Sequence, residues 1–122
     1  MAITTVDYDA PSGLSRYKNT DSNETKSGVK ASSGTIYSII IDNTANAAVS
    51  YLKLYDAASG SVTVGTTAPD WIFKVAASTK VTILFPEGIA FGTALTEASL
   101  TAGGTAGSTG PTSDMAVTIL YA

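Results

Sequence analysis

The 122-residue chain contains no cysteine and no histidine. Without cysteine it can form neither disulfides nor thiolate metal sites. Without histidine it lacks the usual general base near neutral pH, the commonest zinc ligand and the base of Ser-His and Cys-His dyads. These two absences exclude many classes of enzyme.

Charge and long apolar runs are also scarce. Charged residues make up 14% of the chain and the formal net charge is −3, whereas a nucleic-acid-binding protein normally carries a clustered basic face. No apolar run approaches the ~20 residues of a membrane span, and residues 1–13 lack the basic and apolar regions of a signal peptide. We therefore expect one soluble domain, made in the cytoplasm, with neither nucleic acid nor membrane as a partner.

From Thr35 onward the chain is rich in β-branched and aromatic residues, arranged in short runs that turn residues separate. The runs read TIYSIIID, SYLKLYD, WIFKV, TKVTILF, TEASLT and MAVTILYA. Several of them alternate between apolar and smaller or polar positions, which favours an all-β fold, a β-sandwich or jelly roll, over residues 35–122. We interpret residues 65–70 as a connector, after which Trp71 begins a strand, and residues 85–88 as a turn.

Residues 1–34 have a different composition. They hold eight charged residues, four of each sign, and few large apolar ones. Neither strict alternation nor a 3.6-residue period persists there, so we expect no central strand. Such a segment buries too little surface to offset a chain entropy of about 1–2 kcal/mol per ordered residue. Two interpretations stay open, a disordered tail and an extended N-terminal arm that orders on a partner; the expected anchors of the arm are Ile3, Val6, Tyr8, Leu14 and Tyr17.

Carboxylates are the only plausible acid–base groups, and their spacing matches no catalytic or metal motif. Asp7 and Asp9 offer oxygens to a cation, but a calcium loop needs further ligands at fixed spacing. Four other acids lie at predicted turns, where Asp is favoured for local backbone hydrogen bonds: Asp42, Asp56, Asp70 and Glu87. The glycine-rich loop 101–113 lacks the lysine and helix of a phosphate site. We therefore expect no catalytic residue, no metal and no cofactor, and a protein that is not an enzyme.

The apolar and aromatic residues of the strands allow two further interpretations. Tyr37, Tyr51, Tyr55 and Trp71 could form a ligand platform, although aromatic residues on strands belong more often to a core or a subunit interface. The strand YSIII is apolar on both faces, and a two-layer sandwich buries only one face of each sheet. Identical neighbours would cover the other face. We therefore expect a homotrimer; its expected contact residues are Ile36, Ile40, Tyr51 and Tyr55.

The order of the segments over residues 33–122 resembles a family of small virion structural proteins of tailed bacteriophages, of the capsid decoration (cement) type. The matching elements are Asn43-Thr44, Tyr51–Asp56, Val64-Gly65-Thr66, Ala68-Pro69, Phe85-Pro86 and Gly88–Phe91. The resemblance implies a β-sandwich or jelly roll that assembles as trimers on the capsid exterior and clamps major capsid protein subunits, without a cofactor. Residues 1–34 lie outside it.

Two other functions remain as alternatives. One is a tail, fibre or baseplate module that binds a host glycan or protein, which would show an aromatic cleft at Tyr51, Tyr55 or Trp71. The other is a small enzyme or lectin of different origin, which would need a carboxylate pair or bound calcium.

Overall fold

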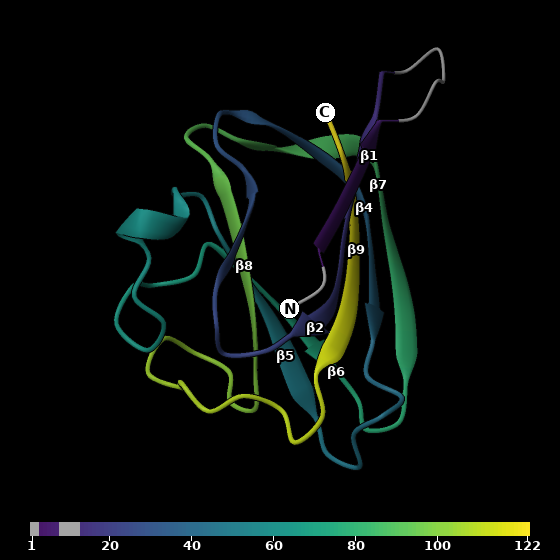
Figure 1. The fold of residues 1–122 in the computed structure, drawn as a ribbon, viewed down its shortest axis with the longest axis vertical. Coiled ribbons are helices and arrows are strands. Elements are labelled where there is room, and N and C mark those ends of the chain that lie inside the picture. The colour runs from purple at the N-terminus through teal and green to yellow at the C-terminus, as the bar shows by residue number, and fades with distance from the viewer. Residues whose placement is uncertain (1–2, 8–12) are drawn as a thin grey trace.

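The computed structural model describes residues 3–7 and 13–122. Over these residues the chain forms strands and one turn of 3-10 helix, η1 (Ser59–Ser61). The strands are β1 (Ile3–Asp7), β2 (Ser15–Ser22), β3 (Ser27–Lys30), β4 (Gly34–Asp42), β5 (Ser50–Tyr55), β6 (Trp71–Val75), β7 (Lys80–Phe91), β8 (Leu95–Leu100) and β9 (Met115–Tyr121). They make two antiparallel sheets that pack face to face, so the predicted all-β sandwich is confirmed (Figure 1). Within the described ranges, no helix has the length and apolar character needed to cross a bilayer.

The strand order is that of a jelly roll. The five-stranded sheet runs β1-β2-β9-β4-β7 and the four-stranded sheet runs β3-β8-β5-β6. The first half of the chain therefore pairs with the second half in reverse order, β2 with β9, β3 with β8, β4 with β7 and β5 with β6. An eight-stranded antiparallel ribbon wrapped so that successive pairs fall alternately in two sheets is a jelly roll. Strand β1 extends the five-stranded sheet at the edge of β2.

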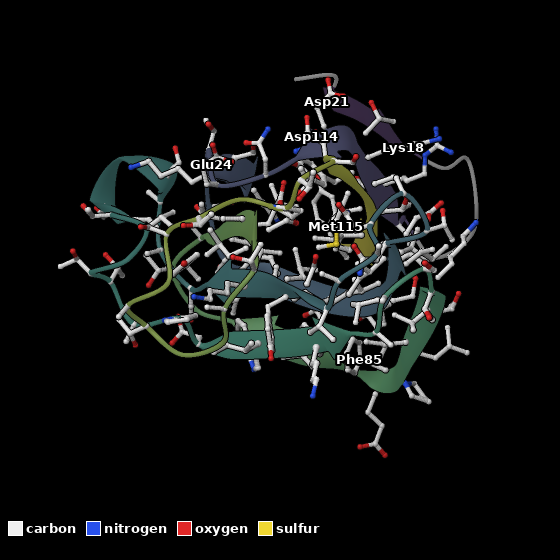
Figure 2. The ribbon with its side chains drawn as sticks, turned by 90° about the horizontal axis from the view of Figure 1, so that it is seen from below. Lys18, Asp21, Glu24, Phe85, Asp114 and Met115 are labelled. Carbon is white, nitrogen blue, oxygen red and sulfur yellow. The ribbon has the colours of Figure 1, made fainter. Side chains whose placement is uncertain are left out.

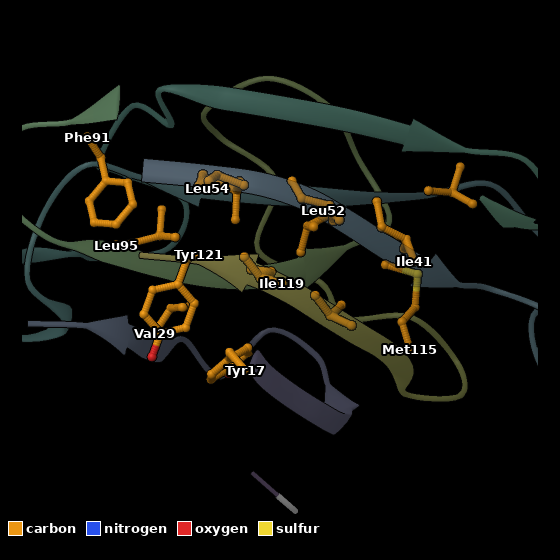
Figure 3. Close-up of a cluster of buried hydrophobic side chains, with 14 residues drawn as sticks. Tyr17, Val29, Ile41, Leu52, Leu54, Phe91, Leu95, Met115, Ile119 and Tyr121 are labelled. Carbon is orange, nitrogen blue, oxygen red and sulfur yellow. The ribbon is translucent and has the colours of Figure 1, made fainter. Parts of the chain in front are cut away.

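The core lies between the two sheets and follows from the period-two alternation of the strands. In β9 every second side chain is buried, from Met115 to Tyr121. Viewed from below, Met115 lies among the side chains between the sheets, whereas Lys18, Asp21 and Glu24 lie at the periphery (Figure 2). Facing side chains of β4, β5, β8 and β9 complete the core, among them Ile41, Leu52 and Ile119 (Figure 3). At one side Phe73 of β6 packs on Phe85 of β7 with ring centroids 6.2 Å apart, which links the edges of the two sheets.

The outer face of the four-stranded sheet is covered by the chain itself over β5 and β8, whereas Ile72 and Lys74 of the edge strand β6 stay exposed. Every residue of β8 is buried, although only alternate ones face the core. The other residues are covered by the connections 56–70 and 101–114, which lie on the side of β8 away from β9 (Figure 1). Tyr55, Val62 and Ala98 form a second small apolar cluster there. The long connections therefore have a structural role as a cover for this sheet.

The prediction of a separate arm over residues 1–34 is wrong for residues 15–30. Strand β2 lies between β1 and β9, and β3 forms an edge of the four-stranded sheet. Tyr17 is completely buried and Val29 nearly so, so these residues belong to the sandwich. The local pattern is weak because the inward positions of β2 include Asn19 and Ser22, whose polar groups are satisfied by residues more than 70 positions away. Of the other predicted anchors, Leu14 is half-buried before β2, Ile3 and Val6 lie in β1, and Tyr8 lies outside the described residues.

The predicted turn at residues 85–88 is also wrong, because β7 continues through it to Phe91. The register of β4 and β7 shifts there, since Ser38 pairs with Leu84 and Ile36 pairs with Ile89. The extra residues of β7 form a bulge. Pro86 has no backbone N–H, and β7 can contain it because it is an edge strand, with a neighbour on one side only. The connector before Trp71 is confirmed, because β6 begins at this residue and the indole packs against the core.

Candidate functional site

The outer face of the five-stranded sheet carries exposed and half-buried side chains over β4, β7 and β9. Its centre, called the open face below, consists of Ser38 and Ile40 of β4, Thr82 and Leu84 of β7, and Thr118 and Leu120 of β9. Ser38 lies between Leu84 and Leu120 in register, and Ile40 lies between Thr82 and Thr118. Leu84 is 69% exposed, the largest exposure given for a large apolar side chain among the described residues. The open face is thus a flat, uncharged surface of apolar and hydroxyl groups.

Charged residues lie at the margins of the open face. Asp42 of β4 pairs in register with Lys80 of β7 at one end, and Lys18 of β2 pairs with Thr118 at the side. The Thr44 hydroxyl and backbone N–H donate to the Asp42 carboxylate, and these bonds hold its pKa below the ordinary value. An apolar centre with a polar rim is the usual anatomy of a protein interface.

The four predicted subunit-contact residues differ in how far they are buried. Ile40 lies on the open face and is half-buried. Ile36 and Tyr55 are completely or almost completely buried, so the prediction that they contact a neighbour is wrong. Tyr51 is half-buried, and its ring lies against Gly103 of the covering loop. The error arises because a strand apolar on both faces does not reveal which face its own chain covers.

The aromatic platform that a glycan-binding module would show is not assembled from Tyr51, Tyr55 and Trp71. Trp71 pairs with Leu54 and packs against the main core. Tyr55, the next residue along β5, points to the opposite side of the sheet and is buried under the 56–70 connection. These rings therefore lie on opposite sides of the four-stranded sheet. Burial raises the pKa of the Tyr55 hydroxyl.

Turn acids act as backbone acceptors, in agreement with the sequence pattern. The Asp56 carboxylate accepts hydrogen bonds from three successive backbone N–H groups, those of Gly92, Thr93 and Ala94 (2.9, 2.8 and 3.3 Å). Those bonds lower the pKa of Asp56. Asp70 in turn accepts from the backbone N–H of Asp56 at 2.6 Å. Both carboxylates tie connections together.

Lys53 of β5 is a buried cation that sequence reasoning did not single out. It lies on the covered side of the four-stranded sheet, and its Nζ donates to the Gly107 carbonyl oxygen at 3.4 Å. Burial lowers the pKa of this amine. The glycine-rich loop thus packs over a lysine, and it offers the amine no acidic side chain among the hydrogen bonds that the structure shows.

The described residues form no candidate metal site. Within 3–7 and 13–122, no three His, Cys, Asp or Glu side chains are grouped so as to hold a metal ion. Of the two acids considered for calcium, Asp7 ends β1 and Asp9 lies outside the described residues.

A buried carboxyl group, Glu97 of β8, is the feature that sequence reasoning missed. It points between the sheets and is completely buried. Its oxygens accept hydrogen bonds from Tyr17 Oη, Asn19 Nδ2 and Ser22 Oγ. The one sequence signal was an acidic residue within an otherwise uncharged strand segment, LTEASL. That signal could not indicate which face of the strand Glu97 occupies.

Comparison with known proteins adds no relative. No protein-family model matches the chain, and searches of curated proteins and of solved structures returned no significant match.

Proposed function

We propose that this protein is a bacteriophage head decoration protein, which self-associates and binds the outer capsid surface to stabilise contacts between major capsid subunits. The observation that carries the proposal is the open face, an uncharged surface of the five-stranded sheet centred on Leu84 and Ile40. The chain covers the outer face of its four-stranded sheet with its own loops over β5 and β8, whereas the five-stranded sheet carries exposed and half-buried side chains over β4, β7 and β9. A second copy of the chain is the occupant we assign to this face, since closed symmetry lets one surface be buried in every subunit.

Two further features support a structural role. The resemblance over residues 33–122 is to virion structural proteins of this type, and the jelly roll is a fold that capsid proteins use. Fold alone does not establish function. The buried aromatic rings disfavour the tail or fibre alternative, because Tyr55 and Trp71 offer no shared surface to a glycan.

Localisation in purified particles tests the proposal. Cryo-electron microscopy of virions that contain the protein should show its density in a regular array on the head exterior, with contacts to the major capsid protein. Particles that lack the protein should release their genome at lower temperature than complete particles. Density confined to the tail, or no protein in the particle, would overturn the proposal.

A further inference from the structure

Glu97 joins the two sheets of the sandwich through side-chain hydrogen bonds. It belongs to β8 of the four-stranded sheet, and its partners Tyr17, Asn19 and Ser22 belong to β2 of the five-stranded sheet. Tyr17 Oη and Asn19 Nδ2 donate to Oε1 at 3.0 and 2.8 Å, and Ser22 Oγ lies 2.6 Å from Oε2. These four residues, with Ser99, are called the Glu97 cluster below.

Among the residues whose side chains are described, no basic group contributes to the pKa shift of Glu97. Within the main core its β5 neighbour in register is Leu54, and its β3 neighbour is Ser27. Core residues of β9 present apolar side chains, such as Val117, to the same interior. Of the described residues that hydrogen-bond the carboxyl group, Tyr17 is the titratable one, and its own pKa is raised by burial and by the nearby Glu97. Burial raises the pKa of Glu97, and the hydrogen bonds from Ser22, Asn19 and Tyr17 oppose that rise only in part.

The geometry of the cluster accommodates a proton on Glu97 without the loss of a hydrogen bond. Ser22 Oγ lies 2.6 Å from Glu97 Oε2 and 2.6 Å from Ser99 Oγ. When the carboxyl group is neutral, its O–H can donate to Ser22 Oγ, and the Ser22 hydroxyl then donates to Ser99. When it is ionised, Ser22 donates to Oε2 and Ser99 donates to Ser22. Both forms are hydrogen-bonded, so the cost of burying an unpaired charge decides between them, and that cost favours the neutral form.

We propose that Glu97 is a pH-dependent cross-link, which as a neutral carboxylic acid holds β2 and the following β2–β3 turn onto β8 and loosens them when it ionises as the pH rises. One backbone hydrogen bond also links β8 to the β2–β3 turn, from the Ser99 N–H to the Asn23 carbonyl oxygen (2.9 Å). Opening would therefore begin where β2 leads into β3, between the two sheets. This inference is independent of the proposed function.

The direction of the pH dependence follows from proton linkage. The folded-state pKa of Glu97 lies above the ordinary value of 4.5 that the unfolded chain shows. Between those two values the folded protein holds a proton that the unfolded chain has released, so stability falls as pH rises. The ratio of unfolded to folded molecules should increase by up to about tenfold per pH unit in this window. The loss is complete above the folded-state pKa, and the full contribution is present below 4.5.

Denaturation at a series of pH values tests the proposal with Glu97→Gln and, as the matched control, Glu87→Gln, whose side chain is exposed on β7. As pH rises above 4.5, the unfolding free energy of the wild type should fall relative to that of Glu97→Gln. Glu87→Gln should not reproduce this effect. Carbon-13 NMR of the Glu97 carboxyl group in the wild type should show a resonance that titrates above the ordinary value of 4.5.

A second variant keeps the test decisive if Glu97→Gln does not fold. Ser22→Ala removes a donor that lowers the pKa of Glu97, so the Glu97 resonance should titrate at still higher pH. Limited proteolysis across a pH series should detect cleavage within residues 23–30 once Glu97 has ionised and not below pH 4.5. A Glu97 resonance that titrates at or below the ordinary value of 4.5, or parallel stability curves for all variants, would overturn the proposal.

Discussion

Asp56 shows how a single polar side chain can hold a connection in place. Its Oδ1 accepts from the backbone N–H groups of Thr93 and Ala94, and its Oδ2 accepts from that of Gly92. An ionised carboxylate suits this position because both oxygens act only as acceptors. The β7–β8 connection is thereby tied to the end of β5.

We predict that Asp56→Asn destabilises the protein by about 1 kcal/mol at neutral pH, because an amide must turn its NH₂ group toward one of the donor N–H groups and the site is partly exposed to solvent. The pKa of Asp56 is lowered from 3.8, so wild-type stability should fall as pH decreases through the folded-state pKa, and the variant should lack this part of the acid dependence. Urea denaturation measures both effects. Glu87→Gln, which also removes one negative charge, is the control; equal stability of Asp56→Asn and wild type would contradict the prediction.

Among the elements, β7 depends most clearly on one glycine. Gly88 has φ +76° within the bulge, a conformation that residues with a Cβ rarely adopt. A Cβ at this position would lie 2.3 Å from Thr35 Cγ2 and 3.2 Å from Tyr37 Cε1. Both the backbone angle and the space beside β4 therefore require glycine.

We predict that Gly88→Ala lowers the free energy of unfolding by about 1–3 kcal/mol, as expected for a residue forced into a sparsely populated conformation and a close contact. Gly60→Ala is the matched control, because Gly60 has no heavy atom within 4 Å of the added Cβ. That control should change stability by no more than about 0.5 kcal/mol. Thermal and chemical denaturation of the two variants decide the prediction, and a Gly88→Ala protein as stable as the control would show that the bulge can relax.

At the scale of the whole molecule, the two sheets differ in how their outer faces are covered. The connections 56–70 and 101–114 pack over the four-stranded sheet, where even Lys53 is buried. The open face of the five-stranded sheet instead leaves Leu84 mostly exposed beside Ile40 and Leu120. An uncovered apolar surface of this kind is typical of a contact with another subunit.

We predict that the wild type sediments as a homotrimer at tens of micromolar and that Leu84→Asp and Ile40→Asp each shift it toward the monomer. A carboxylate on the open face would lose its hydration in the contact without a partner. Leu84→Asp should leave the fold intact because Leu84 is already exposed, which circular dichroism checks. Thr105→Asp, at an exposed position of the loop 101–114, is the control and should remain assembled. A strictly monomeric wild type would contradict the prediction for the free protein.

Local pattern was sufficient for much of the fold. The alternating apolar residues of β9 and the short β-branched runs of β4 to β8 predict strands because period-two alternation is a property of neighbouring residues. The same local chemistry placed Asp56 and Asp70 in connections and Trp71 at the start of a strand. It also indicated that β4 is apolar on both faces.

Only the tertiary structure decided which of these residues face solvent and which strands join the sandwich. Tyr17, Asn19 and Ser22 are stabilised in β2 by Glu97, which lies 75–80 positions further along the chain, so no local window indicates that residues 15–22 form an inner strand. Ile36 faces the core between the sheets and Tyr55 lies under the 56–70 connection, whereas Ile40 and Leu84 lie on the open face. Alternation depends on adjacent residues, so the sequence by itself determined the strands from Thr35 onward. Burial depends on contacts between distant segments, so only the tertiary structure decided the place of β2 and β3, the exposed surface and the Glu97 cluster.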